Sequence, residues 1–166
     1  MLRQTIIALM AALGAALSAT AAFAQSPADT LITVDNPATY SQRLADEIAR
    51  DGVIATAPIL TRIYALQAGV ADIQLNPQQL AQFTTIQQMI AGRRATVVQQ
   101  LADIALADTL RSIYYYHYFG RNVWIYTRLD FVRVGETQWA LSALLWNSDA
   151  NALGIEPGAL PYRSVE

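Results

Sequence analysis

The sequence contains no cysteine, no lysine and only one histidine. Without cysteine the chain has no disulfide, no thiol chemistry and no site for an acyl anchor. A zinc site or a histidine-cluster metal site is not expected either. The sequence also lacks the motifs of dinucleotide-binding, nucleotide-hydrolysing, zinc-protease and serine-hydrolase proteins. We therefore predict no metal site and no cofactor.

Charged residues are scarce as well. They make up 14% of the chain, and 11 basic against 13 acidic residues leave a net charge of −2. A nucleic-acid partner is not expected, because such binders carry a basic surplus. Hydrophobic residues reach 54%, which is unlike a disordered chain. A length of 166 residues suffices for one hydrophobic core.

The first 24 residues show the three parts of a secretory signal peptide. Arg3 gives a basic start, residues 6–17 are apolar, and small residues lead to a cleavage site near Ala24/Gln25. Because a membrane span needs about 20 apolar residues, we predict cleavage and not anchoring. Abundant alanine, with arginine as the only strong base, is typical of a GC-rich bacterial genome. We expect a periplasmic protein without a membrane partner after cleavage.

Three helices are predicted after a flexible leader at residues 25–35. Asparagine or proline marks each start and glycine each end, as helix caps require. The helices are expected from Pro37 to Asp51, from Pro58 to Gly69 and from Pro77 to Gly92.

Residues 97–106 allow two predictions. Val97, Val98, Leu101, Ile104 and Ala105 have helical spacing, which favours a fourth helix. The alternative is a strand that ends at a turn near residues 107–109.

The composition changes after Leu110. Ten of the fifteen aromatic residues lie between Tyr114 and Trp146, interleaved with β-branched residues. Three-residue glycine loops at 120–122 and 135–137 predict strands at about 111–119, 123–134 and 138–147. Helices followed by an antiparallel meander define one α+β domain over residues 36–149, with an irregular tail at 150–166.

The hairpin loops also predict the two faces of the sheet, because side chains alternate along a strand. The apolar face, expected against the helices, holds Ile113, Tyr115, His117, Phe119, Val123, Ile125, Thr127, Leu129, Phe131, Trp139, Leu141, Ala143 and Leu145. The opposite face holds Tyr114, Tyr116, Tyr118, Trp124, Tyr126, Arg128, Asp130, Val132, Ser142, Leu144 and Trp146.

The second half resembles small exported NTF2-like proteins of the cystatin-like superfamily. The residues that carry the resemblance are the runs 110–115 and 123–134, Gly135, Trp139-Ala140-Leu141 and Asn147-Ser148-Asp149. The resemblance implies helices in the hollow of a curved antiparallel sheet, with residues 97–106 as a strand. It implies no single activity, because the family includes ligand-binding, scaffolding and enzymatic proteins, and no catalytic motif carries over.

His117 and Asp130 are the candidate catalytic residues. His117 lies on the predicted apolar face, as a core histidine or beside Ser142 or Thr127 as part of a catalytic arrangement. Asp130 alternates with Arg128, either as simple charge balance or with Arg128 as an anion clamp. A one-residue shift in register would place Asp130 in the hollow, as a general base beside Tyr64 or Tyr115.

The other face carries the candidate interface. Its members are Tyr114, Tyr116, Tyr118, Trp124, Tyr126, Arg128 and Trp146. An exposed aromatic surface of this kind marks interaction sites, and the alternative is that Leu153, Ile155, Leu160 and Tyr162 of the tail cover it.

The predicted function is that of a non-enzymatic binding domain. We expect it to form a homodimer through the sheet face and to bind a protein or a small apolar ligand. An isomerase or lyase with Asp130 as base is the alternative, and chaperoning of exported proteins is a third reading.

Overall fold

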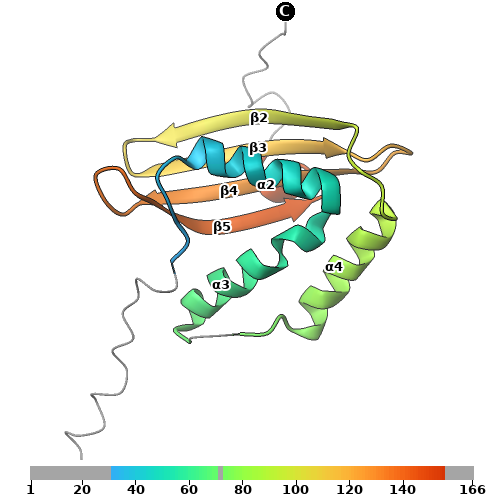
Figure 1. Ribbon diagram of the computed structural model, residues 1–166, viewed down its shortest axis with the longest axis horizontal. Helices are drawn as coiled ribbons and strands as arrows, with labels where there is room; N and C mark the ends of the chain where they lie inside the picture. The colour runs from blue at the N-terminus through green and yellow to red at the C-terminus, as the bar shows by residue number, and fades with distance from the viewer. Residues whose placement is uncertain (1–30, 71–72, 156–166) are drawn as a thin grey trace, which may run out of the picture.

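The computed structural model describes residues 31–70 and 73–155. The predicted signal peptide, most of the predicted leader and residues 156–166 lie outside this range. The described chain is an α+β structure in which three α-helices accompany one curled antiparallel sheet (Figure 1). None of the helices in these ranges has the length and apolar character that a membrane span requires.

The three predicted helices are confirmed, each close to its expected bounds. They are α2 (Pro37–Asp51), α3 (Ala57–Ala68) and α4 (Pro77–Ile90), with a short 3-10 helix, η2 (Val53–Thr56), between the first two. The Asn36 side chain accepts a hydrogen bond from the Thr39 amide at 3.1 Å. Asn76 and Gln79 form a reciprocal capping box at the start of α4. Capping by these side chains therefore marks where α2 and α4 begin.

The sheet has five strands in the order β1-β5-β4-β3-β2. They are β1 (Thr33–Val34), β2 (Val97–Leu106), β3 (Leu110–Tyr118), β4 (Trp124–Arg133) and β5 (Trp139–Asn147). The sequence predicts a meander of three or four strands, and it does not predict β1. This short strand falls in the predicted leader and pairs with β5 at the edge of the sheet.

Residues 97–106 form a strand, so the helix that their spacing predicts is wrong. β2 pairs antiparallel with β3 and contains an irregularity between Gln100 and Ala102. One extra residue in a strand replaces a spacing of two by a spacing of three, which imitates helical periodicity. Pairing with β3 decides the conformation here, and not local propensity.

Both predicted hairpin loops are confirmed. The Phe119 amide donates to the Val123 carbonyl at 2.8 Å, and the Val134 amide donates to the Gln138 carbonyl at 2.9 Å. The register of β3 with β4 is consequently the predicted one. It directs Ile113, Leu129 and Phe131, each 0% exposed, toward the helices.

The predicted faces of β5 are wrong beyond Leu141. Asp130 pairs with Ala143 and Phe131 with Leu141, so Ser142 is an extra residue in β5. Such a bulge moves every later side chain to the opposite face. Leu144, 3% exposed, and Trp146 therefore face the helices, whereas Leu145 is 43% exposed.

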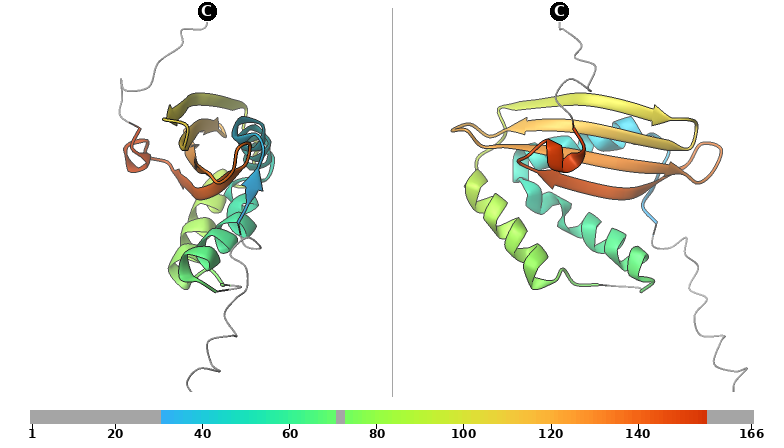
Figure 2. Two further views of the ribbon diagram at one scale, coloured as in Figure 1. Left: turned by 90° about the vertical axis from the view of Figure 1, so that its left-hand side faces the viewer. Right: turned by 180° about the vertical axis from the view of Figure 1, so that it is seen from behind.

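The core lies where the sheet curls around α2 (Figure 2, left). Leu44 and Ile48 of α2 are buried together with Leu129 of β4. On the β5 side, Phe83 of α4 meets Trp146 edge to face, with ring centroids 5.0 Å apart. The helices thus close the concave face of the sheet.

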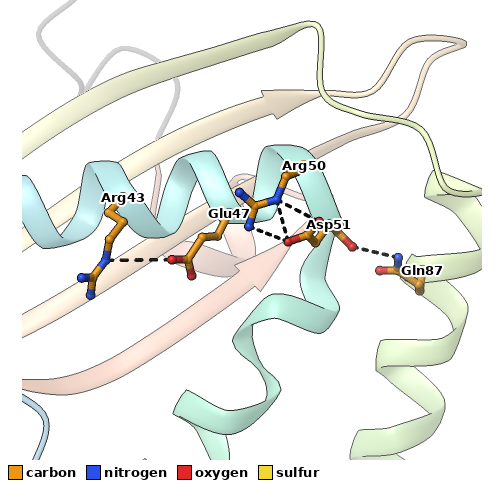
Figure 3. Close-up of polar contacts among 5 residues, drawn as sticks. All are labelled: Arg43, Glu47, Arg50, Asp51 and Gln87. Atoms are coloured by element: carbon orange, nitrogen blue, oxygen red, sulfur yellow. Dashed lines mark hydrogen bonds and ion pairs between the residues drawn. The ribbon is translucent and has the colours of Figure 1, made fainter.

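A close contact between the end of α2 and α4 holds the helices together. Gln87 of α4 donates through Nε2 to the Asp51 carbonyl oxygen at 3.1 Å (Figure 3). Gly52, the next residue, has φ of +80°, and a Cβ there would lie 2.5 Å from Gln87 Oε1. The positive φ favours glycine at this position, and a Cβ there would displace the end of the Gln87 side chain.

Candidate functional site

Two cross-strand aromatic pairs lie on the convex face of the sheet, away from the helices. Tyr116 of β3 pairs with Tyr126 of β4, with ring centroids 5.4 Å apart, and Tyr118 pairs with Trp124. Trp124 is 38% exposed, and Val97 beside Tyr118 on β2 is 44% exposed. We call Tyr116, Tyr118, Trp124 and Tyr126 the aromatic patch.

The aromatic patch is held in place and uncharged at Tyr116. The Trp124 indole donates through Nε1 to the Ser148 carbonyl at 2.9 Å, which fixes the ring against the sheet. Burial raises the pKa of the Tyr116 phenol, and the neighbouring phenols of Tyr126 and Tyr118 raise it further. The surface therefore presents apolar rings, with a neutral hydroxyl group at Tyr116, which suits contact with another protein.

The other half of the convex face is covered by the chain itself. Residues 150–155, which we call the covering segment, include the short helix η3 (Asn151–Leu153), seen in front of the sheet in Figure 2, right. Leu153 and Ile155, each 4% exposed, pack on Ala102 and Tyr114. Tyr114 is accordingly 7% exposed. The predicted cover by the tail is thus confirmed for Leu153 and Ile155, whereas Leu160 and Tyr162 lie outside the described residues.

Arg128 connects the covering segment to the sheet. Its guanidinium donates to Asp130 Oδ1 at 2.8 Å and to the Leu153 carbonyl at 3.3 Å. The Arg128 guanidinium also lies 5.6 Å from the centre of the Tyr114 ring. The hydrogen bond to Asp130 raises the pKa of Arg128. These contacts occupy Arg128 within the chain, which favours the structural interpretation over an anion clamp.

Asp130 lies on the convex face, in the predicted register, and not in the hollow. Besides Arg128 it has Ser112, whose hydroxyl donates to Asp130 Oδ1 at 2.6 Å. Tyr115, one of the two proposed partners of an Asp130 base, is buried on the opposite face. The general-base hypothesis requires a one-residue shift in register, and β3 and β4 do not show that shift.

His117 is a core residue between the sheet and α2. It is 0% exposed, and its Nε2 lies 3.2 Å from Thr127 Oγ1. Burial lowers the pKa of His117 to about 4, against a smaller opposing effect of Asp46. Ser142 does not join this pair, because its hydroxyl donates to the Asp130 carbonyl oxygen at 3.0 Å. The structure therefore favours the core interpretation of His117.

Tyr115, next to His117, is buried in the same layer. Its hydroxyl donates to the side-chain oxygens of Gln100 at 3.3 Å and Gln42 at 3.4 Å. Burial raises the pKa of Tyr115 to about 12. One pocket of about 320 Å³ lies between η2, the start of α3, and α4, where Leu80 and Phe83 line it, and it does not reach Tyr115 or His117.

Trp146 does not belong to the convex surface with which it is predicted to act. It packs on Phe83 and contributes to the main core. Exposed hydrophobic residues on the convex face instead include Val97, opposite Tyr118, and Leu145, opposite Arg128. Sequence reasoning missed both, because the bulges in β2 and β5 that direct them outward leave no local signal.

Comparison of the chain with protein-family models, with curated proteins and with solved structures finds no match in any of the three.

Proposed function

We propose that this chain is an exported, non-enzymatic binding domain that associates with a second copy of itself through the aromatic patch. The observation that carries the proposal is the division of the convex face. The covering segment buries Tyr114, yet it leaves Trp124 and the hydrophobic Val97 exposed. The other three rings of the aromatic patch are half-buried, and Tyr126 packs against the edge of the covered cluster. A cluster of rings that the chain covers only in part is the kind of surface that a partner covers.

The composition of the patch supports a protein partner. Tyrosine and tryptophan dominate the energetically important centres of interfaces, because they bury large areas at a small cost in side-chain entropy. The pairing of Tyr116 with Tyr126 and of Tyr118 with Trp124 makes the surface rigid before binding. A twofold arrangement of two such patches would bring rings against rings.

An NTF2-like identity and a periplasmic location form part of the same proposal. The resemblance covers about residues 96–149 and implies helices in the hollow of a curved antiparallel sheet. An α+β fold with a curled five-stranded antiparallel sheet is consistent with that expectation. The basic start, apolar stretch and small-residue cleavage site of the first 24 residues support export.

Solution mass tests the association. Light scattering on the chain from Gln25 to Glu166 should give a dimer that dissociates on dilution, and Trp124→Glu with Tyr126→Glu should give a monomer. The matched control is Val70→Glu with Met89→Glu, which adds the same charge at positions that are 45% and 43% exposed on other surfaces. A monomeric wild type, or a control that dissociates as readily, would refute the proposal.

Export is tested separately. The full chain, expressed in a bacterium with two membranes, should appear in the periplasmic fraction with Gln25 as its first residue. A chain that keeps Met1 and stays in the cytoplasm would contradict this part of the proposal and leave the association untouched.

A further inference from the structure

A second concave site lies at the β1 edge of the sheet, and no residue of the aromatic patch lines it. Its walls are β1 with the preceding Ile32, the first turns of α2, and the start of α3. The pocket has a volume of about 480 Å³, within the range of roughly 300–1,000 Å³ that small-molecule sites occupy. We call it the arginine pocket, because Arg43 of α2 and Arg62 of α3 both line it.

Tyr40 lines the pocket together with the two arginines. The Arg43 guanidinium lies 5.1 Å from the centre of the Tyr40 ring. Burial raises the pKa of Tyr40; Arg43 acts against this shift, Glu47 adds to it, and Arg62 opposes it to a smaller extent. The Tyr40 ring is itself fixed from behind by Phe131, edge to face at 6.2 Å. The pocket lining thus contains two guanidinium groups and one phenol hydroxyl.

One acid forms an ion pair with the arginines of the pocket. Glu47 lies 3.9 Å from Arg43, measured between Oε1 and Nε, and the side chains of Arg43 and Glu47 are 68% and 39% exposed. Figure 3 shows this pair on the surface of α2. The recorded contact of Arg62 is a hydrogen bond of 3.4 Å to the Leu31 carbonyl, and it has no ion pair among the residues that the structure describes. A solvent-exposed pair of this length contributes little, so Arg43 and Arg62 keep donors for a ligand.

Besides the two arginines and Tyr40, the lining includes the polar side chain of Thr33 and several apolar side chains. Ile32, Val34 and Ile59 contribute hydrocarbon surface. β1 is the last strand of the sheet, and its far edge has no strand partner among the described residues. A ligand that fits needs an anionic head for the guanidinium groups and an apolar body for the isoleucine and valine side chains.

We propose that the arginine pocket binds a small organic carboxylate. Guanidinium groups pair with carboxylates through two parallel hydrogen bonds, a geometry that a planar acid offers and a neutral molecule does not. The apolar wall favours an acid with a compact hydrocarbon body over a bare inorganic anion. This inference does not rest on the proposed self-association, because it uses no residue of the patch.

Calorimetric titration of the chain from Gln25 to Glu166 tests the ligand class with three probes. Benzoate should bind, and benzamide, which has the same shape without the charge, should bind at least about tenfold more weakly. Inorganic phosphate should also bind more weakly than benzoate. No binding of benzoate, equal binding of benzamide, or phosphate binding as tight as benzoate would each overturn the proposal.

Variants locate the site. Arg62→Gln should weaken benzoate binding by about tenfold. Arg62→Lys keeps the charge without the planar guanidinium, so its affinity for benzoate should lie between those of the wild type and Arg62→Gln. Arg111→Gln is the matched control, because Arg111 is an equally long cation paired with Asp103 at 2.6 Å on β2 and β3. The melting temperature of each variant shows whether it is folded. Unchanged binding in a folded Arg62→Gln, or an equal loss in Arg111→Gln, would refute the assignment.

Discussion

The concave and convex faces of β3 and β4 both carry aromatic rings, yet they are closed in different ways. On the concave face, Tyr115 and Phe131 are each 0% exposed beneath the helices. On the convex face, Trp124 is 38% exposed, while Tyr114 is 7% exposed only because the covering segment lies on it. The number of rings on a strand therefore does not decide whether they form a core. What lies opposite them decides it.

This difference between the two faces predicts how much each part of the sheet contributes to the free energy of unfolding. The concave face should contribute most of the free energy of unfolding, the covered half of the convex face less, and the aromatic patch least. Each of the following changes tests one step in this order.

The largest effect is expected for Phe131→Ala on the concave face. Removal of a fully buried phenylalanine typically costs about 3–5 kcal/mol, and here it also leaves Tyr40 without its ring partner. Urea unfolding measures the change. Val132→Ala, at the next position on the convex face, is the control and should cost less than about 1.5 kcal/mol. Equal losses would mean that the two faces are closed alike.

His117 gives the concave face a dependence on pH. Its pKa is about 4 in the folded chain and 6.5 by reference in the unfolded chain, because burial disfavours the charged imidazole. Below pH 6.5 the unfolded chain binds the extra proton, so this stability is full above pH 6.5 and is lost as the pH falls toward 4. Between pH 7 and pH 5 the loss should be about 2 kcal/mol.

Urea unfolding at several pH values measures that loss, and His117→Gln should remove most of the slope between pH 7 and pH 5. An NMR titration of the imidazole gives an independent check in the wild type. An imidazole that takes up its proton near pH 6.5 while the chain stays folded would contradict the prediction.

Much of the fold can be predicted from residues that are close together in the sequence. Asn36 and Asn76 cap helices whose starts they predict, and the glycine loops at 120–122 and 135–137 fix the register of the two hairpins. These features depend on residues that are close in the chain. The coarse α+β class, with helices before an antiparallel meander, follows from them.

The errors arise where contacts between distant residues decide the geometry. The extra residue at Ser142 turns Trp146 from the convex to the concave face, and the irregularity near Gln100 makes a strand look helical. The burial of Tyr114 depends on Leu153, far away in sequence. The arginine pocket has the same origin, because α2 and α3 supply one arginine each. No local pattern carries this information.

Leu153→Ala tests the covered half of the convex face. The loss of a buried leucine at the edge of a small cluster should cost about 2 kcal/mol, at the low end for such changes. Hydrogen exchange should show that Ala102 and Tyr114 lose protection while the core strands keep theirs. Ala152→Ser, at an exposed neighbour, should change neither quantity. A loss of protection throughout the sheet would show that the segment belongs to the main core.

The smallest effect on folding is expected within the aromatic patch. Tyr118→Ser removes one cross-strand pair with Trp124, and such pairs contribute about 0.2–1 kcal/mol. The same change should raise the dissociation constant of the proposed dimer by tenfold or more, because aromatic side chains at the centre of an interface contribute most of its energy. Urea unfolding at low concentration and light scattering at high concentration separate the two quantities. A large loss in the free energy of unfolding of the monomer, with an unchanged dissociation constant of the dimer, would assign Tyr118 to the core. The convex face would then not differ from the concave face at that residue.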